Sequence, residues 1–319
     1  MILSHYDIIK VTKLLKGDRV IEKFRYFHRH FPHLEIEQLI EHYAVFGGLE
    51  KYLTLNFSDT LKTSIRLNIL ERYRFLKTKV LPPIGFDDES RRMLRAVAVS
   101  DGKTINVLRR ASLSRQQGHG TYHALRRIGI LHKELSRETQ PTPTYTHKKL
   151  PRKKEVRRYR IQDRIKFSHP FHRFWYTFVE PHAHSIEAGD YEPFFKEVAE
   201  SLDRYVSFTF EELANALITQ TFDAKDPVTE KGNYWDRHNE FDLLAKTVSD
   251  RIIIGECKWK SHKICKSQIT KLKAKCERSG IKPHYYALFS KSGFSKELQN
   301  CKDPTLLCFD LNDFERLLR

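Results

Sequence analysis

Ile252-Ile253-Ile254-Gly255-Glu256-Cys257-Lys258-Trp259 is a run of strand-forming residues that carries two charges. Residues two apart in a strand project from the same face, so Glu256 and Lys258 point one way and Cys257 points the other. The alternating segment Glu240-Phe241-Asp242-Leu243-Leu244-Ala245 precedes this run, and Ser249-Asp250 supplies a turn between the two. The pattern predicts a β-hairpin with ionisable groups inside it.

Asp242 precedes Glu256 by 14 positions, a separation at which a hairpin brings the Asp242 carboxylate opposite the face that carries Glu256 and Lys258. Hard divalent cations bind carboxylate oxygens, and a bound cation stabilises charge on a phosphate and acidifies water. We therefore expect Asp242 and Glu256 to bind Mg²⁺ or Mn²⁺. Lys258 is expected to position or help deprotonate the attacking water and to balance developing negative charge.

Glu211 is the expected third acid of this phosphodiester-hydrolysing site. A helix is predicted to begin near Phe210, and Glu211 follows it directly, with Glu212 as its near competitor. The alternative is that these charges are ordinary surface residues or a structural ion pair at a strand end. We favour a catalytic site, because unpaired charge inside a hydrophobic strand is costly.

The positive charge of the chain is concentrated in one segment. The formal net charge is +17, and residues 88–160 contain 19 Lys or Arg against six Asp or Glu, a net charge of +13. Such a concentration favours a polyanionic partner over a merely solubilising surface.

The same segment predicts three short helices followed by a β-hairpin. Apolar residues recur at helical spacing in three stretches, of which the last, residues 116–128, ends with Gly129 as its C-cap. Residues 130–136 are expected to pair with residues 156–161. This order of elements is typical of a winged helix-turn-helix.

In that arrangement the third helix enters the major groove of DNA, and the loop of the hairpin contacts phosphates. Winged helices also mediate protein contacts or link domains, but the charge favours DNA. The expected DNA-contacting residues are Arg115, Gln116, His119, Tyr122, Arg126 and Arg127 on the helix, and Lys148, Lys149, Arg152, Lys153 and Lys154 on the loop.

The chain as a whole is expected to be a multidomain α+β or α/β protein. Residues 1–84 show helical periodicity, residues 85–162 form the predicted winged helix, and residues 163–319 combine a helical linker with a mixed sheet flanked by helices. No apolar run is long enough to span a bilayer and no signal peptide is visible, so we expect a cytoplasmic protein without membrane contact. The five cysteines contain no C-x-x-C pair, so neither a zinc ribbon nor a disulfide framework is expected.

The sequence resembles the region that follows the NTPase core in archaeal and bacterial AAA-type ATPases, including its C-terminal DUF234-type domain. The likeness covers most of the chain from about His42 onward. It is carried by residues 42–53, 159–163, 174–181, 210–212, 240–245, 255–259 and 289–294. The resemblance implies a winged helix joined to a restriction-endonuclease-like fold of the PD-(D/E)-x-K type. Asp242, Glu256 and Lys258 then fall on its motif positions, and Glu211 on its helix position.

One feature of such ATPases is missing from the sequence. The chain contains no G-x-x-x-x-G-K-[ST] motif, so it is not expected to hydrolyse ATP. It is expected to be either a truncated relative that kept its DNA-handling half or a protein completed by a separate ATPase.

The leading functional prediction is a metal-dependent DNA endonuclease. A rival prediction is a non-catalytic DNA-binding regulator whose nuclease fold is degenerate. A third is an accessory subunit that docks on an NTPase in trans.

Overall fold

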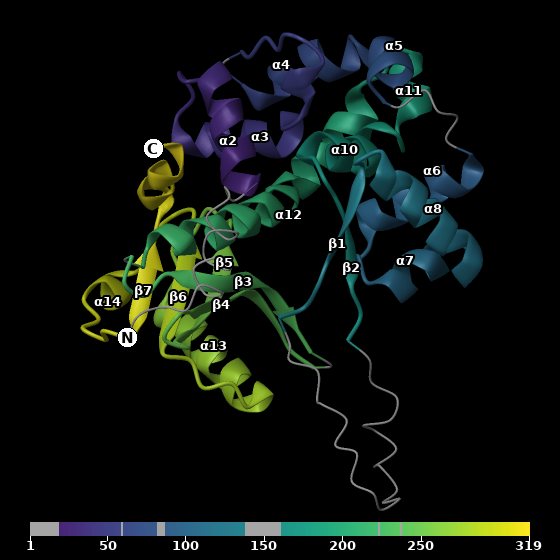
Figure 1. The fold of residues 1–319 in the computed structure, drawn as a ribbon. Coiled ribbons are helices and arrows are strands. Elements are labelled where there is room, and N and C mark those ends of the chain that lie inside the picture. Colours follow the sequence, from purple (N-terminus) through teal and green to yellow (C-terminus); the bar gives the residue numbers. More distant parts are fainter. Residues whose placement is uncertain (1–18, 59, 82–86, 138–160, 223, 237) are drawn as a thin grey trace, which may run out of the picture.

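Figure 1 shows the fold in a computed structural model of the chain. The structure describes residues 19–58, 60–81, 87–137, 161–222, 224–236 and 238–319.

The first described region is helical, as the sequence predicts. Phe24 and Phe27 lie on one face of the first helix and are fully buried against the second helix. The tight turn at Gly47-Gly48, where Gly48 has a φ of 99°, ends the second helix and redirects the chain. The elements are α2 (Arg19–His30), α3 (Ile36–Phe46), η1 (Leu49–Lys51), α4 (Leu61–Ile65), η2 (Arg66–Leu70), α5 (Tyr73–Phe75) and η3 (Leu76–Val80).

A three-helix segment and a two-stranded hairpin follow. Ser114 caps the third helix with a reciprocal capping box, and Gly129, with a φ of 78°, ends it as predicted. The elements are α6 (Asp88–Val99), α7 (Thr104–Arg110), α8 (Arg115–Arg127), β1 (Leu131–Glu134) and β2 (Arg164–Phe167). A single antiparallel bridge from Lys103 to Arg164 extends the hairpin ahead of α7.

The prediction of the pairing strand was wrong. β1 pairs with Arg164–Phe167, not with residues 156–161, of which residues 156–160 lie outside the described part of the chain. The physical reason is burial: Ile165 and Phe167 pack into the core beneath the helices, and Leu131 lies opposite Phe167. The expected loop residues Lys148, Lys149, Arg152, Lys153 and Lys154 also lie outside the described residues.

A second helical stretch connects the hairpin to the C-terminal sheet. It comprises α10 (Pro170–Phe174), η4 (Trp175–Val179), α11 (Ala183–Glu187), α12 (Glu192–Leu217) and η5 (Ile218–Gln220). The helix expected to begin near Phe210 instead begins at Glu192, with Pro193 in its first turn. Phe210 is therefore in the second half of a 26-residue helix that reaches from the helical region to the sheet (Figure 1).

The C-terminal region is a five-stranded mixed sheet in the order β3-β4-β5-β6-β7. The first three strands are antiparallel to one another, and β6 and β7 continue the sheet parallel to β5. The strands are β3 (Val228–Trp235), β4 (Glu240–Thr247), β5 (Ile252–Lys258), β6 (Tyr285–Ser290) and β7 (Leu306–Phe309), with α13 (Lys266–Ser279), α14 (Lys296–Gln299) and η6 (Leu311–Leu318) between or after them.

The two faces of this sheet are covered by different helices. Leu243, Ala245 and Ile253 belong to a core cluster that continues into α12 and the helical region, whereas Ile254 and Leu288 pack with α13 on the other side. Figure 1 shows α12 and α13 on opposite sides of the sheet. This mixed α+β architecture, with a helical N-terminal region and a C-terminal mixed sheet, agrees with the predicted class. Within the described part of the chain, we find no helix whose length and apolar character would let it cross a lipid bilayer.

Candidate functional site

A β-bulge positions Asp242. Gly232 pairs with Leu244 and Tyr234 pairs with Phe241, so β4 has one more residue than β3 between these two pairs. Bulges bend a strand locally and change the direction of a side chain. Here the extra residue falls at Asp242 or Leu243, and Oδ2 of Asp242 accepts a hydrogen bond from the main-chain N–H of Cys257 (2.8 Å). The Asp242 carboxylate therefore lies against β5, where it interacts electrostatically with Glu256.

Glu256 lies between two lysines. Lys258 donates to its Oε1 (2.6 Å), and Lys275 of α13 donates to its Oε2 (2.9 Å). The Lys258 contact confirms that Glu256 and Lys258 project from the same face of β5, with Cys257 buried on the other. Both oxygens of a nearly buried carboxylate are thus bound to ammonium groups.

Glu211 reaches the same site from α12. Its carboxylate interacts electrostatically with Asp242 and with Lys166 of β2. Asn215, one turn later, donates to the main-chain oxygens of both Glu211 (2.9 Å) and Asp242 (2.8 Å), and so ties α12 to β4. Glu212 interacts with Lys23 and His132, which places Glu211 nearer to the other acids than its competitor.

The acids of the site differ in their protonation. Burial raises the pKa of Asp242 to about 7, and the Glu256 carboxylate adds to this effect. Burial also raises the pKa of Glu211 to about 8, with Asp242 as the next cause. Burial alone would raise the pKa of Glu256, but Lys258 and Lys275 outweigh it and hold that pKa below its ordinary value. Glu256 is therefore charged at neutral pH, while Asp242 and Glu211 are poised to lose protons when a further cation approaches.

Two carboxylates of the site, those of Asp242 and Glu256, are the groups that could hold a hard divalent cation. Among the described residues, no group of three or more His, Cys, Asp and Glu side chains is arranged to hold a metal ion. Mg²⁺, however, keeps several water molecules and is commonly bound through one or two carboxylates. Asp242 and Glu256 provide two, and the ammonium groups on Glu256 show that this carboxylate already attracts cations.

The helix-hairpin segment is attached beside this site. Ser136, just after β1, accepts from the Trp235 main-chain N–H (3.0 Å) and donates to the Trp235 main-chain oxygen (2.7 Å). Arg164 of β2 is buried, pairs with Glu240 at the start of β4 (2.6 Å) and lies 4.3 Å from the Trp235 ring centroid. The hairpin therefore docks onto β3 and β4, close to Asp242.

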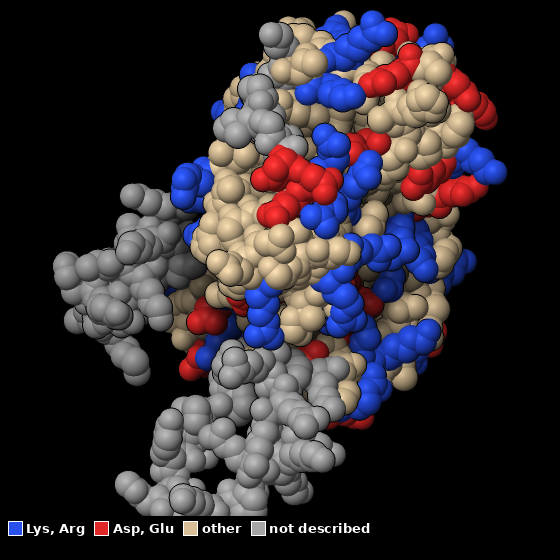
Figure 2. Space-filling view, turned by 90° about the vertical axis from the view of Figure 1, so that its right-hand side faces the viewer, with Lys and Arg blue, Asp and Glu red and all other residues tan. Residues whose placement is uncertain are grey.

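Most of the expected DNA-contacting residues of α8 are exposed. Arg115, Gln116, His119, Arg126 and Arg127 lie on its solvent side. None of its three arginines forms an ion pair with another described residue. Figure 2 shows the face that carries α6, α7 and α8, where Lys and Arg side chains are interspersed with Asp and Glu and with uncharged residues.

Tyr122, which was also expected to contact DNA, is buried instead. It is only 3% exposed, and its ring packs under the Lys133 ammonium at 5.2 Å. Position 122 shares the inward face of α8 with Gly118 and Leu125, which are also buried, so an aromatic side chain there contributes to the core. Tyr122 is thus not placed to read a base.

Two residues of the site were missed from the sequence. Lys275 is one of four lysines in α13, and nothing in the sequence singles it out except that it follows buried Leu272 by three positions, at the edge of the apolar stripe. Asn215 lies in a helix interior, where asparagine is unfavourable, and this mismatch is a signal that could have identified it.

Comparison with known families finds one match. Residues 175–272 match the model of DUF234, described as archaeal and bacterial proteins of unknown function. No curated protein and no solved structure matches the chain. The matched segment contains Glu211, Asp242, Glu256 and Lys258, and it ends three residues before Lys275. The segment that is similar to DUF234 therefore spans all of α12, the strands β3 to β5 and the first half of α13.

Proposed function

We propose that this chain is a DNA-binding protein whose C-terminal domain hydrolyses phosphodiester bonds with a divalent metal ion. The observation that carries the proposal is the convergence of Asp242, Glu256 and Lys258 on adjacent strands, with Glu211 coupled to Asp242. A mixed sheet flanked by helices is the setting that the resemblance to the PD-(D/E)-x-K fold predicts.

In this proposal each side chain has a distinct role. Asp242 and Glu256 would hold Mg²⁺ or Mn²⁺, which supplies charge stabilisation at the phosphate and a more acidic water. Lys258 would orient the attacking water and offset negative charge that develops on the phosphate. Glu211, whose raised pKa lies near neutrality, is suited to take up or release a proton beside Asp242.

Lys275 is proposed as a positioning residue. Its ammonium binds the Glu256 oxygen that Lys258 does not, and also lies 3.4 Å from the Glu240 main-chain oxygen. It keeps Glu256 ionised and oriented, and it must release Oε2 for both carboxylate oxygens to face a metal ion.

The segment from α6 to β2 is proposed to be a winged helix that binds DNA through α8. Three helices, the Lys103 bridge and the β1–β2 hairpin occur in the order expected of that module. The arginines on the exposed side of α8, which have no acidic partner in the described part of the chain, favour a phosphate backbone as the partner. Docking of the hairpin on β3 would hold a bound duplex near the carboxylates.

Plasmid cleavage tests the catalytic part of the proposal. Supercoiled plasmid is incubated with the purified chain and Mg²⁺ or Mn²⁺, and nicking is followed by gel electrophoresis. Asp242→Asn and Glu256→Gln are expected to abolish nicking and to retain DNA binding. The matched control is Glu230→Gln, at an exposed acid on the neighbouring strand β3. Nicking that persists in both site variants contradicts the assignment of the site.

A second candidate function rests on the two lysines. Because both oxygens of Glu256 are bound to ammonium groups, the site is neutralised without a metal ion. This arrangement favours a non-catalytic DNA-binding regulator, or an accessory subunit of a separate ATPase, in which the nuclease fold is degenerate. It predicts salt-dependent DNA binding, no cleavage with any divalent metal, and no Mn²⁺ binding in calorimetry.

A further inference from the structure

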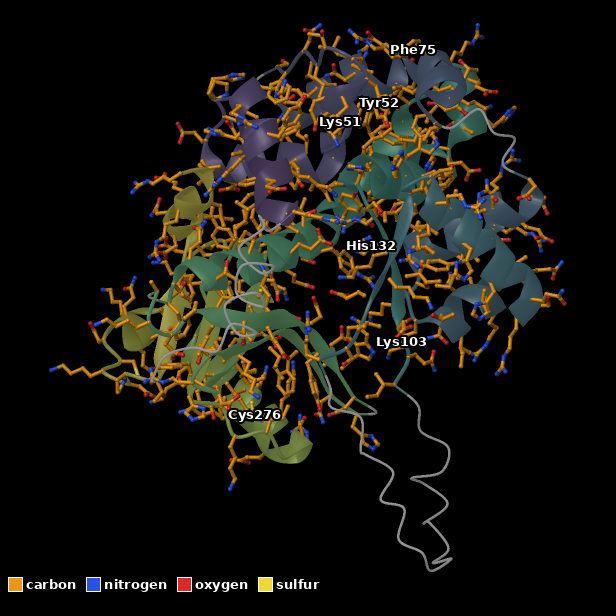
Figure 3. The ribbon with its side chains drawn as sticks, viewed as in Figure 1. Lys51, Tyr52, Phe75, Lys103, His132 and Cys276 are labelled. Carbon is orange, nitrogen blue, oxygen red and sulfur yellow. The ribbon has the colours of Figure 1, made fainter. Side chains whose placement is uncertain are left out.

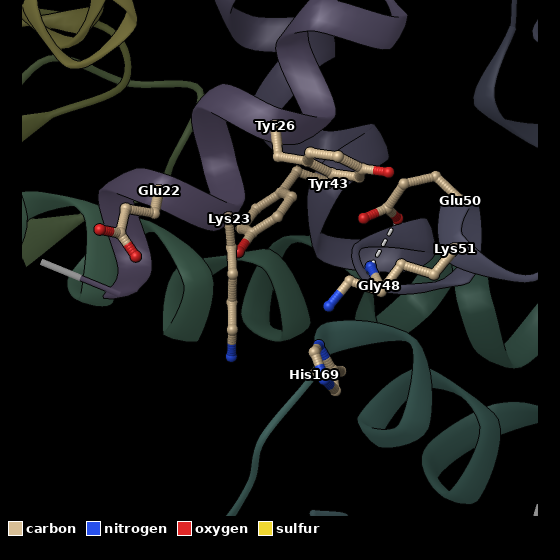
Figure 4. Close-up of a pocket in the computed structure, with 8 residues that line it drawn as sticks. All are labelled: Glu22, Lys23, Tyr26, Tyr43, Gly48, Glu50, Lys51 and His169. Carbon is tan, nitrogen blue, oxygen red and sulfur yellow. Dashed lines mark hydrogen bonds between the residues drawn. The ribbon is translucent and has the colours of Figure 1, made fainter. Parts of the chain in front are cut away.

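A cavity of about 180 Å³ lies in the helical region. It is enclosed by α2, by the end of α3 with the turn and η1 that follow it, and by His169 just before α10 (Figure 4). At about 30 Å³ per water molecule, it has room for a phosphate group and part of the molecule that bears it. Its lining residues are Glu22, Lys23, Tyr26, Tyr43, Gly48, Glu50, Lys51 and His169.

The cavity is lined by several hydrogen-bond donors, and few of them are bound to an acceptor of the described residues. Lys23 donates to the main-chain oxygen of Ser168 (2.7 Å), which leaves two of its three N–H groups available. Lys51 has no ion pair or hydrogen bond from its ammonium among the residues described, and the His169 ring likewise has no hydrogen bond there. Figure 4 shows the Lys51 and Lys23 ammonium groups on the side of the cavity where His169 lies.

The electrostatic surroundings of His169 are positive. Burial lowers its pKa to about 3, and Lys23, His172, Lys51 and His132 add to this lowering in that order, so the His169 imidazole is neutral at neutral pH. Burial also lowers the pKa of Lys23; Glu212 opposes this lowering, and Lys51 adds to it. The two ammonium groups repel each other, so an anion placed between them would relieve the repulsion, and the neutral imidazole can donate an N–H to it.

Neither acid of the lining forms an ion pair with Lys23 or Lys51 in the described part of the chain, although Glu50 interacts electrostatically with both. Glu50 is turned back onto its own loop, where Oε2 accepts from the Gly48 N–H (2.6 Å), and burial raises its pKa. Glu22 extends away from Lys51 and His169 in Figure 4. Gly48 itself packs against the His169 ring: a Cβ at this position would lie 2.8 Å from Nδ1, so the turn and the imidazole have fixed positions relative to each other.

We infer that this cavity, which we call the Lys23 pocket, binds a phosphate monoester between Lys23, Lys51 and His169. Two ammonium groups and an imidazole N–H match the oxygens of a terminal phosphate, and the rings of Tyr26 and Tyr43 offer apolar surface to the group that bears it. The ligand is a free nucleotide or similar phosphorylated small molecule, or the phosphorylated end of a nucleic-acid strand. The inference does not depend on the proposed nuclease activity, because the pocket uses none of its residues.

Figure 3 relates the pocket to the rest of the molecule. Lys51 lies in the helical region and Cys276 marks α13 beneath the sheet, and His132 of β1 lies between these levels. His132 interacts electrostatically with both Lys23 and Glu212. These three residues therefore extend from the pocket, where Lys23 lies, to the part of α12 that carries Glu211. This position is the reason to test a strand end as well as a free nucleotide.

The test measures binding by the full chain without divalent metal. Inorganic phosphate and AMP are titrated in calorimetry, and a 5′-phosphorylated oligonucleotide is compared with the same 5′-hydroxyl oligonucleotide by fluorescence anisotropy. Lys51→Met and Lys23→Met are each expected to weaken binding about tenfold or more, as loss of a charge-assisted hydrogen bond does. The matched control is Lys196→Met, at an exposed lysine of α12 outside the pocket.

The outcomes are separable. Binding of phosphate and AMP with no preference between the oligonucleotides indicates a small phosphorylated ligand, and a tenfold preference for the phosphorylated oligonucleotide indicates a strand end. The inference is overturned if no phosphate compound binds, if both pocket variants bind like the wild type, or if Lys196→Met loses as much affinity. Lys51 is exposed, so its variant tests the pocket even if Lys23→Met fails to fold. If the wild-type chain binds phosphate but does not cleave plasmid, only the nuclease proposal is contradicted.

Discussion

The carboxylate site on β4 and β5 and the exposed side of α8 both contain charged side chains, but in the part of the chain that the structure describes only the charges of the carboxylate site are paired within the fold. Glu256 has an ammonium on each oxygen, and Asp242 accepts a main-chain N–H. Arg115, Arg126 and Arg127 have no acidic partner among the described residues. Burial explains the difference. A buried charge must be paired within the fold, whereas an exposed charge is solvated by water and is available to bind another molecule.

This difference separates two kinds of evidence for function. The carboxylates are held in one geometry and predict a chemistry, while the arginines predict only a class of partner. Changes at the first region should therefore alter both stability and catalysis. Changes at the second should alter binding and leave the fold intact.

The largest expected effect is on catalysis. Replacing Glu256 with Gln removes the charge that both lysines and a metal ion would share, and we expect plasmid nicking to fall by roughly a thousandfold or more. Gel densitometry under single-turnover conditions measures the change. Nicking within tenfold of the wild type would mean that cleavage does not use this site.

The next effect concerns α8. Replacing Arg115, Arg126 and Arg127 together with Gln should weaken DNA binding about equally for all sequences, because phosphate contacts are lost. The slope of log K against log salt should fall by about one for each contact removed. Anisotropy with duplex DNA at several salt concentrations measures it, and thermal unfolding should be unchanged. An unaltered slope would remove α8 as the DNA-binding surface.

The next prediction concerns the effect of Asp242 on the stability of the fold. Burial raises the pKa of Asp242 to about 7 from an ordinary value of 3.8. The protonated carboxyl therefore favours the folded state at low pH, and the free energy of unfolding declines as pH rises from about 4 to 7. Asp242→Asn should therefore gain stability over the wild type across that window, by up to about 4 kcal/mol at neutral pH, because a difference of one in pKa corresponds to about 1.4 kcal/mol. Urea unfolding at several pH values measures the gain. A difference that does not vary with pH would contradict the buried-carboxyl interpretation.

The smallest expected effect concerns Lys275. Lys275→Met should bind Mn²⁺ several-fold more tightly than the wild type, because the ammonium no longer competes for Oε2 of Glu256. Calorimetry measures affinity directly, without reference to cleavage. The matched control is Lys271→Met, at an exposed lysine of the same helix. Weaker binding in Lys275→Met would mean that the lysine assists the metal site rather than competing with it.

Much of the site could be predicted because it depends on local periodicity. Strand alternation placed Glu256 and Lys258 on one face, and the turn at Ser249-Asp250 brought β4 beside β5. The bulge at Asp242 could not be predicted, because it is an irregularity of the pairing between β3 and β4 rather than a property of either strand. The true partner of β1 was missed for a related reason: burial of Ile165 and Phe167 decided the pairing.

The sequence by itself determined the order of elements, the mixed α+β class, the acids of the candidate site and the positive charge of the central segment. These follow from side-chain period, turn residues and composition, which act over a few positions. Only the tertiary structure decided that Lys275 and Asn215 join the acids, that Tyr122 belongs to the core, and that Lys23, Lys51 and His169 meet around a cavity. Such contacts join residues far apart in the chain, and they arise from the packing of helices and strands against one another, which no local pattern encodes.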